Sequence, residues 1–194
     1  MEDHLMKYER MYCLMAMLTF MAIAWTGCGG GSSSSAGTTA PSTSAPSITV
    51  EAFSSGGPIP AKYTCDGADI SPAVKISGVS SSAKSLVLIV DDPDAPGGTW
   101  NHWVLFDISP ATSDIAENFM PAGAISGSND FGRNQYNGPC PPAGGAHRYY
   151  FRLYALSVAT LGLSEGASRA QVDATMVGAI LEGYPVEYMG TYQR

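Results

Sequence analysis

The stretch Ser85-Leu86-Val87-Leu88-Ile89-Val90 is followed directly by Asp91-Asp92-Pro93-Asp94-Ala95-Pro96. An apolar run without alternation, bounded by turn residues, indicates a strand that is covered on both faces. The run ends abruptly in three carboxylates and two prolines. Because proline fixes φ and removes a backbone donor, a stiff turn presents these acidic side chains at the rim of the core. The stretch therefore predicts a central strand with a candidate site at its end.

The patterns on either side of this strand predict a mostly β fold. Apolar or alternating segments predict further strands at residues 48–53, 61–64, 73–77, 102–108, 148–156 and 186–192. Ser168 and Gln171 make a capping box, which predicts one helix that Gly183 closes. Its apolar stripe would contain Val172, Met176, Val177, Ile180 and Leu181. Residues 109–137 show no sustained period, and a loop of that length usually serves a function or covers a site.

The composition is that of one acidic domain with an added N-terminal segment. The chain has 194 residues, with 10 Lys and Arg against 17 Asp and Glu, and a formal net charge of −7. Binding a nucleic-acid backbone requires a basic stripe that releases counterions, and this chain has none. A nucleic-acid partner is therefore not expected.

The first 28 residues have the pattern of an export signal. Lys7 and Arg10 precede an apolar stretch, residues 11–25, that is too short for a membrane span. Trp25-Thr26-Gly27-Cys28 resembles the lipobox of bacterial lipoproteins, which implies acylation of Cys28; ordinary signal cleavage nearby is the alternative. Residues 29–47 are rich in Gly, Ser, Thr and Pro and predict a flexible tether before a folded domain at 48–194. We expect an extracytoplasmic protein, in the periplasm or at the cell surface, with a lipid anchor.

Three groups of residues could converge on one cavity in this domain. They are Asp92 and Asp94 with His102, the segment 138–146, and His147 with Tyr149. Gly144 and Gly145 can take positive φ, so that their backbone N–H groups could form a small anion nest. His147 and Tyr149 lie two residues apart and would share one face of a strand.

Two long motifs resemble a known family. DDPDAPGGTWNHWVLFDI (residues 91–108) and GPCPPAGGAHRYYFRLYAL (residues 138–156) are similar to the two signatures of the phosphatidylethanolamine-binding protein family, specifically its bacterial and archaeal Raf kinase inhibitor-like branch. The likeness runs from about residue 48 to the end. It implies a large antiparallel sheet packed on a smaller one, with a small pocket at one end for anionic groups such as phosphate or phosphoethanolamine. With Gly144 from the nest, the ligand-binding residues would be Asp92, Pro93, Asp94, Pro96, His102, Pro141, Pro142, His147 and Tyr149.

The carboxylates have an indirect role in this interpretation. A carboxylate beside an imidazole favours its charged form, so Asp92 or Asp94 would hold His102 and His147 as donors facing the anion. Anion affinity is then expected to fall as the pH rises and the histidines lose their protons.

Other functions have weaker support in the sequence. Two histidines and two aspartates could bind a metal ion, but there is no HExxH motif and no His pair at helical spacing. There is no G-x-S-x-G motif for a hydrolase, so a non-catalytic binding protein without a cofactor is expected. Taken singly, an Asp-Pro-Asp turn or a buried histidine is usually only structural. A protein-interaction module that inhibits a protease or kinase stays open as the alternative, although kinase regulation suits an exported chain poorly.

Cys65 and Cys140 are the remaining cysteines of the domain. Export places them in an oxidising compartment, where an even pair suggests a disulfide. Such a bond would tie the segment around Cys65 to the predicted pocket loop. Two buried free thiols are the alternative.

Overall fold

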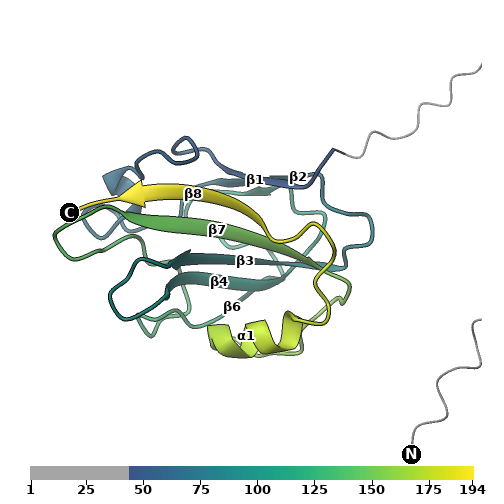
Figure 1. The fold of residues 1–194 in the computed structure, drawn as a ribbon. Helices are drawn as coiled ribbons and strands as arrows, with labels where there is room; N and C mark the ends of the chain where they lie inside the picture. Colours follow the sequence, from purple (N-terminus) through teal and green to yellow (C-terminus); the bar gives the residue numbers. More distant parts are fainter. Residues whose placement is uncertain (1–43) are drawn as a thin grey trace, which may run out of the picture. The chain divides into compact units, whose positions relative to one another are not determined.

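The computed structural model describes residues 44–194, which form two antiparallel sheets (Figure 1). The smaller sheet has the order β1 (Ser47–Val50), β2 (Val74–Ser77), β5 (Asp114–Ile115). The larger has the order β6 (Ile125–Ser126), β4 (Trp100–Ile108), β3 (Ser85–Asp92), β7 (His147–Leu156), β8 (Val186–Tyr192). The helix α1 spans Arg169–Met176. This confirms the predicted fold class; the expected signal segment and most of the expected tether lie outside the described residues.

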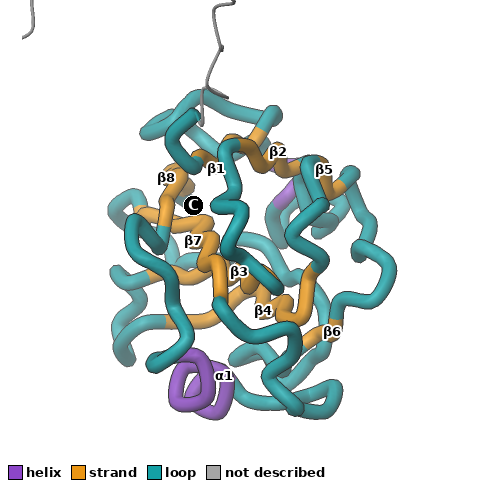
Figure 2. Tube along the Cα trace, turned by 90° about the vertical axis from the view of Figure 1, so that its right-hand side faces the viewer, coloured by secondary structure: helices purple, strands orange, loops and turns teal. Residues whose placement is uncertain are grey.

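The five-stranded sheet forms the middle layer of the domain. Figure 2 shows β1, β2 and β5 on one side of it and α1 on the other. Leu86, Leu88 and Val90 of β3 belong to the core shared with the smaller sheet, whereas Val87 and Ile89 belong to the core under α1. Burying each such side chain stabilises the fold by about 1.5–3 kcal/mol. The unbroken apolar run thus reflects a central strand covered on both faces, as predicted.

The same alternation sends the two acids at the end of β3 to opposite faces. Asp91 lies on the helix side, where it accepts hydrogen bonds from Arg152 Nε at 3.1 Å and Arg169 Nη1 at 3.2 Å. Asp92 lies on the other face, where it contacts His147. Successive side chains of a strand point to opposite faces, so only one of the two adjacent carboxylates can reach that histidine.

The helix begins as predicted and ends earlier. Ser168 is its N-cap, and the capping box with Gln171 is present. The helix stops at Met176, and the next residue, Val177, is 73% exposed, so its predicted place in the apolar stripe is wrong. The chain after Met176 turns to meet the end of β7, where the Ser157 N–H donates to the Ala179 carbonyl at 2.8 Å. Tertiary pairing here outweighs local helical pattern.

Three other segments differ from the expectation. Residues 61–64, predicted as extended, contain a 3-10 helix at Ala61–Tyr63. The first strand ends at Val50 and not at residue 53, and the loop at 109–137 contains the short strands β5 and β6. A two-residue strand is too short to show a period, which explains why the sequence missed both. No helix within residues 44–194 has the length and apolar character needed to cross a membrane.

Candidate functional site

Segments from four parts of the chain enclose a cavity of about 470 Å³ beside the end of β3. They are the turn after β3, the start of β4, the loop before β7 and the first residue of β7. Six predicted residues line it: Asp92, Pro96, His102, Pro141, Pro142 and His147. Four others do not, namely Pro93, Asp94, Gly144 and Tyr149. Both histidines therefore share one cavity, as the sequence predicted.

His147 is held in place by a buried carboxylate. Its Nδ1 lies 2.8 Å from Asp92 Oδ2, and the two side chains are 13% and 4% exposed. The other oxygen of Asp92 accepts the backbone N–H of Asp94 at 2.8 Å. Because Nδ1 is engaged, the ring presents its Nε2 edge, which has no hydrogen-bond partner within residues 44–194. Of the predicted contacts between a histidine and a carboxylate, the one between His147 and Asp92 is present.

His102 lines the cavity in a different state from the one predicted. It is buried, and its Nδ1 donates to the backbone carbonyl of Asn137 at 2.7 Å. Burial lowers the pKa of His102, and this effect outweighs the opposing influence of that carbonyl and of the Asp92 charge. The expected protonated donor is thus corrected to a neutral imidazole whose Nε2 is an acceptor.

Tyr149 lies behind the cavity wall and not in it. Its ring packs edge-on against His102, with centroids 5.3 Å apart, and the side chain is buried. Its hydroxyl has no hydrogen-bond partner among the described residues. Burial and the nearby negative charge of Asp92 raise the pKa of Tyr149, so the hydroxyl stays protonated. The Tyr149 hydroxyl is thus a neutral donor that lies near His102 and Asp92, two residues that line the cavity.

Asp94 is turned away from the cavity, which corrects its predicted role. Its carboxylate accepts from Arg148 Nη2 at 2.7 Å, from Arg148 Nε at 2.8 Å and from the Arg148 backbone N–H at 2.9 Å. These hydrogen bonds lower the pKa of Asp94 to about 2. Asp94 therefore fastens the turn after β3 to the start of β7.

The predicted anion nest is not formed at Gly144. Its N–H donates to the carbonyl of Arg194 at 3.2 Å, and its own carbonyl accepts from Gln193 Nε2 at 2.6 Å. The glycine segment is thus bound to the C-terminal residues. The Gly144 N–H is therefore used within the fold, and Gly144, which does not line the cavity, is removed from the candidate site.

Sequence reasoning missed three prominent residues of the cavity: Trp100, Asp130 and Phe131. Trp100 and Phe131 pack edge to face with centroids 5.6 Å apart, and they are 38% and 39% exposed. Asp130 Oδ2 accepts from the backbone N–H and the side-chain amide of Asn101, at 2.7 and 2.8 Å. Asn129 followed by Gly132 signals a turn at this point of the loop. That signal does not show which side chains reach the site.

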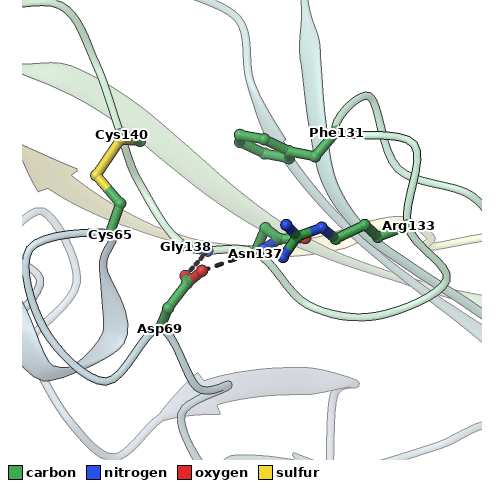
Figure 3. Close-up of a pocket in the computed structure, with 7 residues that line it drawn as sticks. All are labelled: Cys65, Asp69, Phe131, Arg133, Asn137, Gly138 and Cys140. Carbon is green, nitrogen blue, oxygen red and sulfur yellow. Dashed lines mark hydrogen bonds between the residues drawn. A yellow bond between two sulfur atoms is a disulfide. The ribbon is translucent and has the colours of Figure 1, made fainter.

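The wall formed by residues 138–142 is fastened to the segment around Cys65. The predicted disulfide between Cys65 and Cys140 is present in the structure. The Cys65 N–H also donates to the Pro139 carbonyl at 3.1 Å. The carboxylate of Asp69 accepts the Gly138 N–H at 2.6 Å (Figure 3). Several contacts therefore set the position of this wall.

The donors of the site are arranged for hydrogen bonding. Each histidine uses its Nδ1 for a protein acceptor, Asn137 for His102 and Asp92 for His147. Within the described part of the chain, no three His, Cys, Asp or Glu side chains are grouped so that they could hold a metal ion.

The fold and cavity define a two-sheet β protein with a pocket beside its larger sheet, and comparison with known proteins gives the family. The sequence profile described as phosphatidylethanolamine-binding protein matches residues 49–193. A UPF0098 protein of Pyrococcus horikoshii is 51% identical over 144 residues, which cover 70% of this chain and 71% of the relative. One from Aquifex aeolicus is 50% identical over 147 residues, covering 73% and 85%. The chain belongs to the phosphatidylethanolamine-binding protein family.

Two solved structures are similar along almost their whole length. A phosphatidylethanolamine-binding protein homologue from Chlamydia trachomatis has a TM-score of 0.72 at 44% identity, covering 77% of this chain and 98% of its own. YbcL of E. coli, described as a member of the mammalian family, has a TM-score of 0.73 at 27% identity, covering 78% and 99%. These structures confirm the family fold for the described domain.

Proposed function

We propose that this protein is an exported, lipid-anchored, non-catalytic binding protein whose cavity takes a small anionic or phosphorylated group. The observation that carries the proposal is the pair formed by His147 and Asp92 in the cavity wall. Asp92 accepts the hydrogen on Nδ1 and orients the ring. In the imidazolium form of a histidine, Nε2 is a charged donor, here available to a ligand in the cavity. Phosphate and phosphoethanolamine headgroups are the ligand class that fits this donor.

The two carboxylates that line the cavity, Asp92 and Asp130, accept hydrogen bonds from protein donors. Both oxygens of Asp92 are engaged, by His147 and by the Asp94 backbone. Asp130 receives two hydrogen bonds from Asn101. This arrangement supports a small ligand that accepts hydrogen bonds.

A binding role suits these residues better than catalysis does. The sulfur of Cys140, which lines the cavity, is bonded to Cys65 and offers no thiolate nucleophile. Export is supported by the same disulfide, because such bonds persist in oxidising compartments. The signal segment and Cys28 lie outside the described residues, so the anchor rests on their sequence pattern.

The exposed aromatic rings of Trp100 and Phe131 favour a second candidate function. They lie in the wall of the cavity, where a protein partner could cover them. In this alternative the domain inhibits a protease or kinase and the cavity is regulatory. A pull-down that finds a tight partner even for a cavity variant would favour this second function.

Calorimetric titration with phosphoethanolamine tests the first proposal. Replacing His147 with Ala removes the charged donor and is expected to weaken binding at least about tenfold, since a hydrogen bond to a charged group contributes about 1.5–3 kcal/mol. Asp114→Asn is the control, because Asp114 belongs to the smaller sheet and does not line the cavity. Equal affinities of wild type and His147→Ala would refute the proposal.

A further inference from the structure

A second, smaller cavity of about 260 Å³ adjoins the His147 cavity. Phe131 and Cys140 line both of them, so these two side chains form the wall that they share. Figure 3 shows Phe131 and Arg133 on one side of the smaller cavity and the Cys65–Cys140 disulfide on the other. The two cavities are therefore immediate neighbours.

Arg133 is the notable charge of this smaller cavity. Residues 44–194 contain eight lysines and arginines, and six of them form ion pairs with carboxylates. The two without such a pair are Arg133 and Lys84. The Arg133 guanidinium also donates no hydrogen bond within the described residues, and it is exposed. It is thus an available planar donor beside the proposed anion site.

The one carboxylate of the smaller cavity is already engaged by other groups. Asp69 Oδ1 accepts the Gly138 N–H at 2.6 Å and Asp69 Oδ2 accepts Asn137 Nδ2 at 3.1 Å (Figure 3). Asp69 forms no ion pair with Arg133 within residues 44–194. Within residues 44–194, therefore, no carboxylate forms an ion pair with Arg133 in this cavity.

We propose that the Arg133 cavity is a second subsite, which binds a carboxylate carried by the ligand whose phosphate lies in the His147 cavity. This inference rests on the proposed function and narrows its ligand class to phosphate esters that bear a carboxylate. A guanidinium matches a carboxylate through two parallel N–H donors, which gives geometric selectivity as well as charge. The shared wall of Phe131 and Cys140 places the two subsites next to each other.

The decisive comparison uses O-phosphoserine and phosphoethanolamine, which differ only in the carboxylate. Calorimetry on the wild-type protein should show tighter binding of O-phosphoserine by about tenfold, the size of one charged hydrogen-bonded contact. Arg133→Gln should abolish this preference and leave phosphoethanolamine affinity unchanged. Arg133→Lys should retain part of the preference, because lysine keeps the positive charge but lacks the two parallel N–H donors of the guanidinium. Lys84→Gln is the matched control because it removes the other unpaired cation. This variant should keep the full preference for O-phosphoserine.

The outcomes separate this inference from the function on which it rests. If phosphoethanolamine binds and His147→Ala abolishes its binding, but O-phosphoserine binds no more tightly, the second subsite is wrong and the proposed function stands. A preference that survives in Arg133→Gln also overturns the subsite. If neither compound binds the wild type, both proposals fail. Glycerophosphoserine distinguishes the source of the ligand, because a lipid headgroup is a phosphodiester and a free metabolite such as O-phosphoserine is a monoester.

Discussion

Asp94 and Arg148 form the ion pair that joins the turn after β3 to the start of β7. The hydrogen bonds from Arg148 hold the pKa of Asp94 at about 2, below its ordinary value of 3.8. A carboxylate with a lowered folded-state pKa stabilises the fold above pH 3.8, and this contribution is lost as the pH falls toward 2. We expect Asp94→Asn to lower the free energy of unfolding slightly at neutral pH, since solvent screens this half-exposed pair.

Urea denaturation of wild type and Asp94→Asn across this pH range checks the prediction. The difference between the two proteins should shrink as the pH falls from 4 to 2. A difference that stays constant over that range would show that the charge of Asp94 contributes nothing to stability.

His102 is expected to reduce stability in mild acid. Its folded-state pKa is lowered by burial, so the unfolded chain takes up a proton at a higher pH than the native protein does. The free energy of unfolding should therefore fall as the pH drops below 6.5, by at most about 1.4 kcal/mol per pH unit from this group. His102→Gln should reduce that slope in denaturant titrations, and an unchanged slope would contradict the neutral state assigned to His102.

At the scale of elements, the wall at residues 138–142 depends on one glycine. A Cβ on Gly138 would lie 2.0 Å from the Tyr63 carbonyl oxygen, whereas a Cβ on Gly145 would meet open space. Gly138→Ala must therefore shift the wall away from the Tyr63 segment, which should destabilise the domain by about 1–3 kcal/mol and weaken phosphoethanolamine binding.

Gly145→Ala is the matched control for this variant and should behave like wild type. Thermal unfolding and calorimetry of the two variants make the comparison. Equal stability and equal affinity of both would mean that the wall does not depend on the close approach of the backbone at Gly138.

At the scale of the whole molecule, Cys28 is predicted to decide where the domain resides. Acylation at Cys28 would anchor the chain, and the tether at residues 29–47 would hold the domain clear of the membrane. Cys28→Ala should move the protein from the membrane fraction to the soluble exported fraction, with loss of the lipid mass from the N-terminal peptide. Unchanged membrane association of Cys28→Ala would exclude the anchor.

Local sequence patterns determined much of the architecture. The continuous apolar run of β3, the alternation in β7, the capping box of α1 and the strand at residues 186–192 each follow from neighbours within one element. Periodicity and capping act over a few residues, so they can be recognised without the fold. The two long motifs also indicated six residues of the cavity, including both histidines and Asp92.

The roles of individual side chains were decided by tertiary structure. His102 meets Asn137 35 residues away, and Asp94 meets Arg148 54 residues away. Burial lowers the pKa of His102 against the opposing influence of the Asn137 carbonyl, and the contact with Arg148 holds Asp94 outside the cavity lining. Burial, charge and hydrogen-bond partners determine what an ionisable group does, and all three depend on segments that only folding brings together.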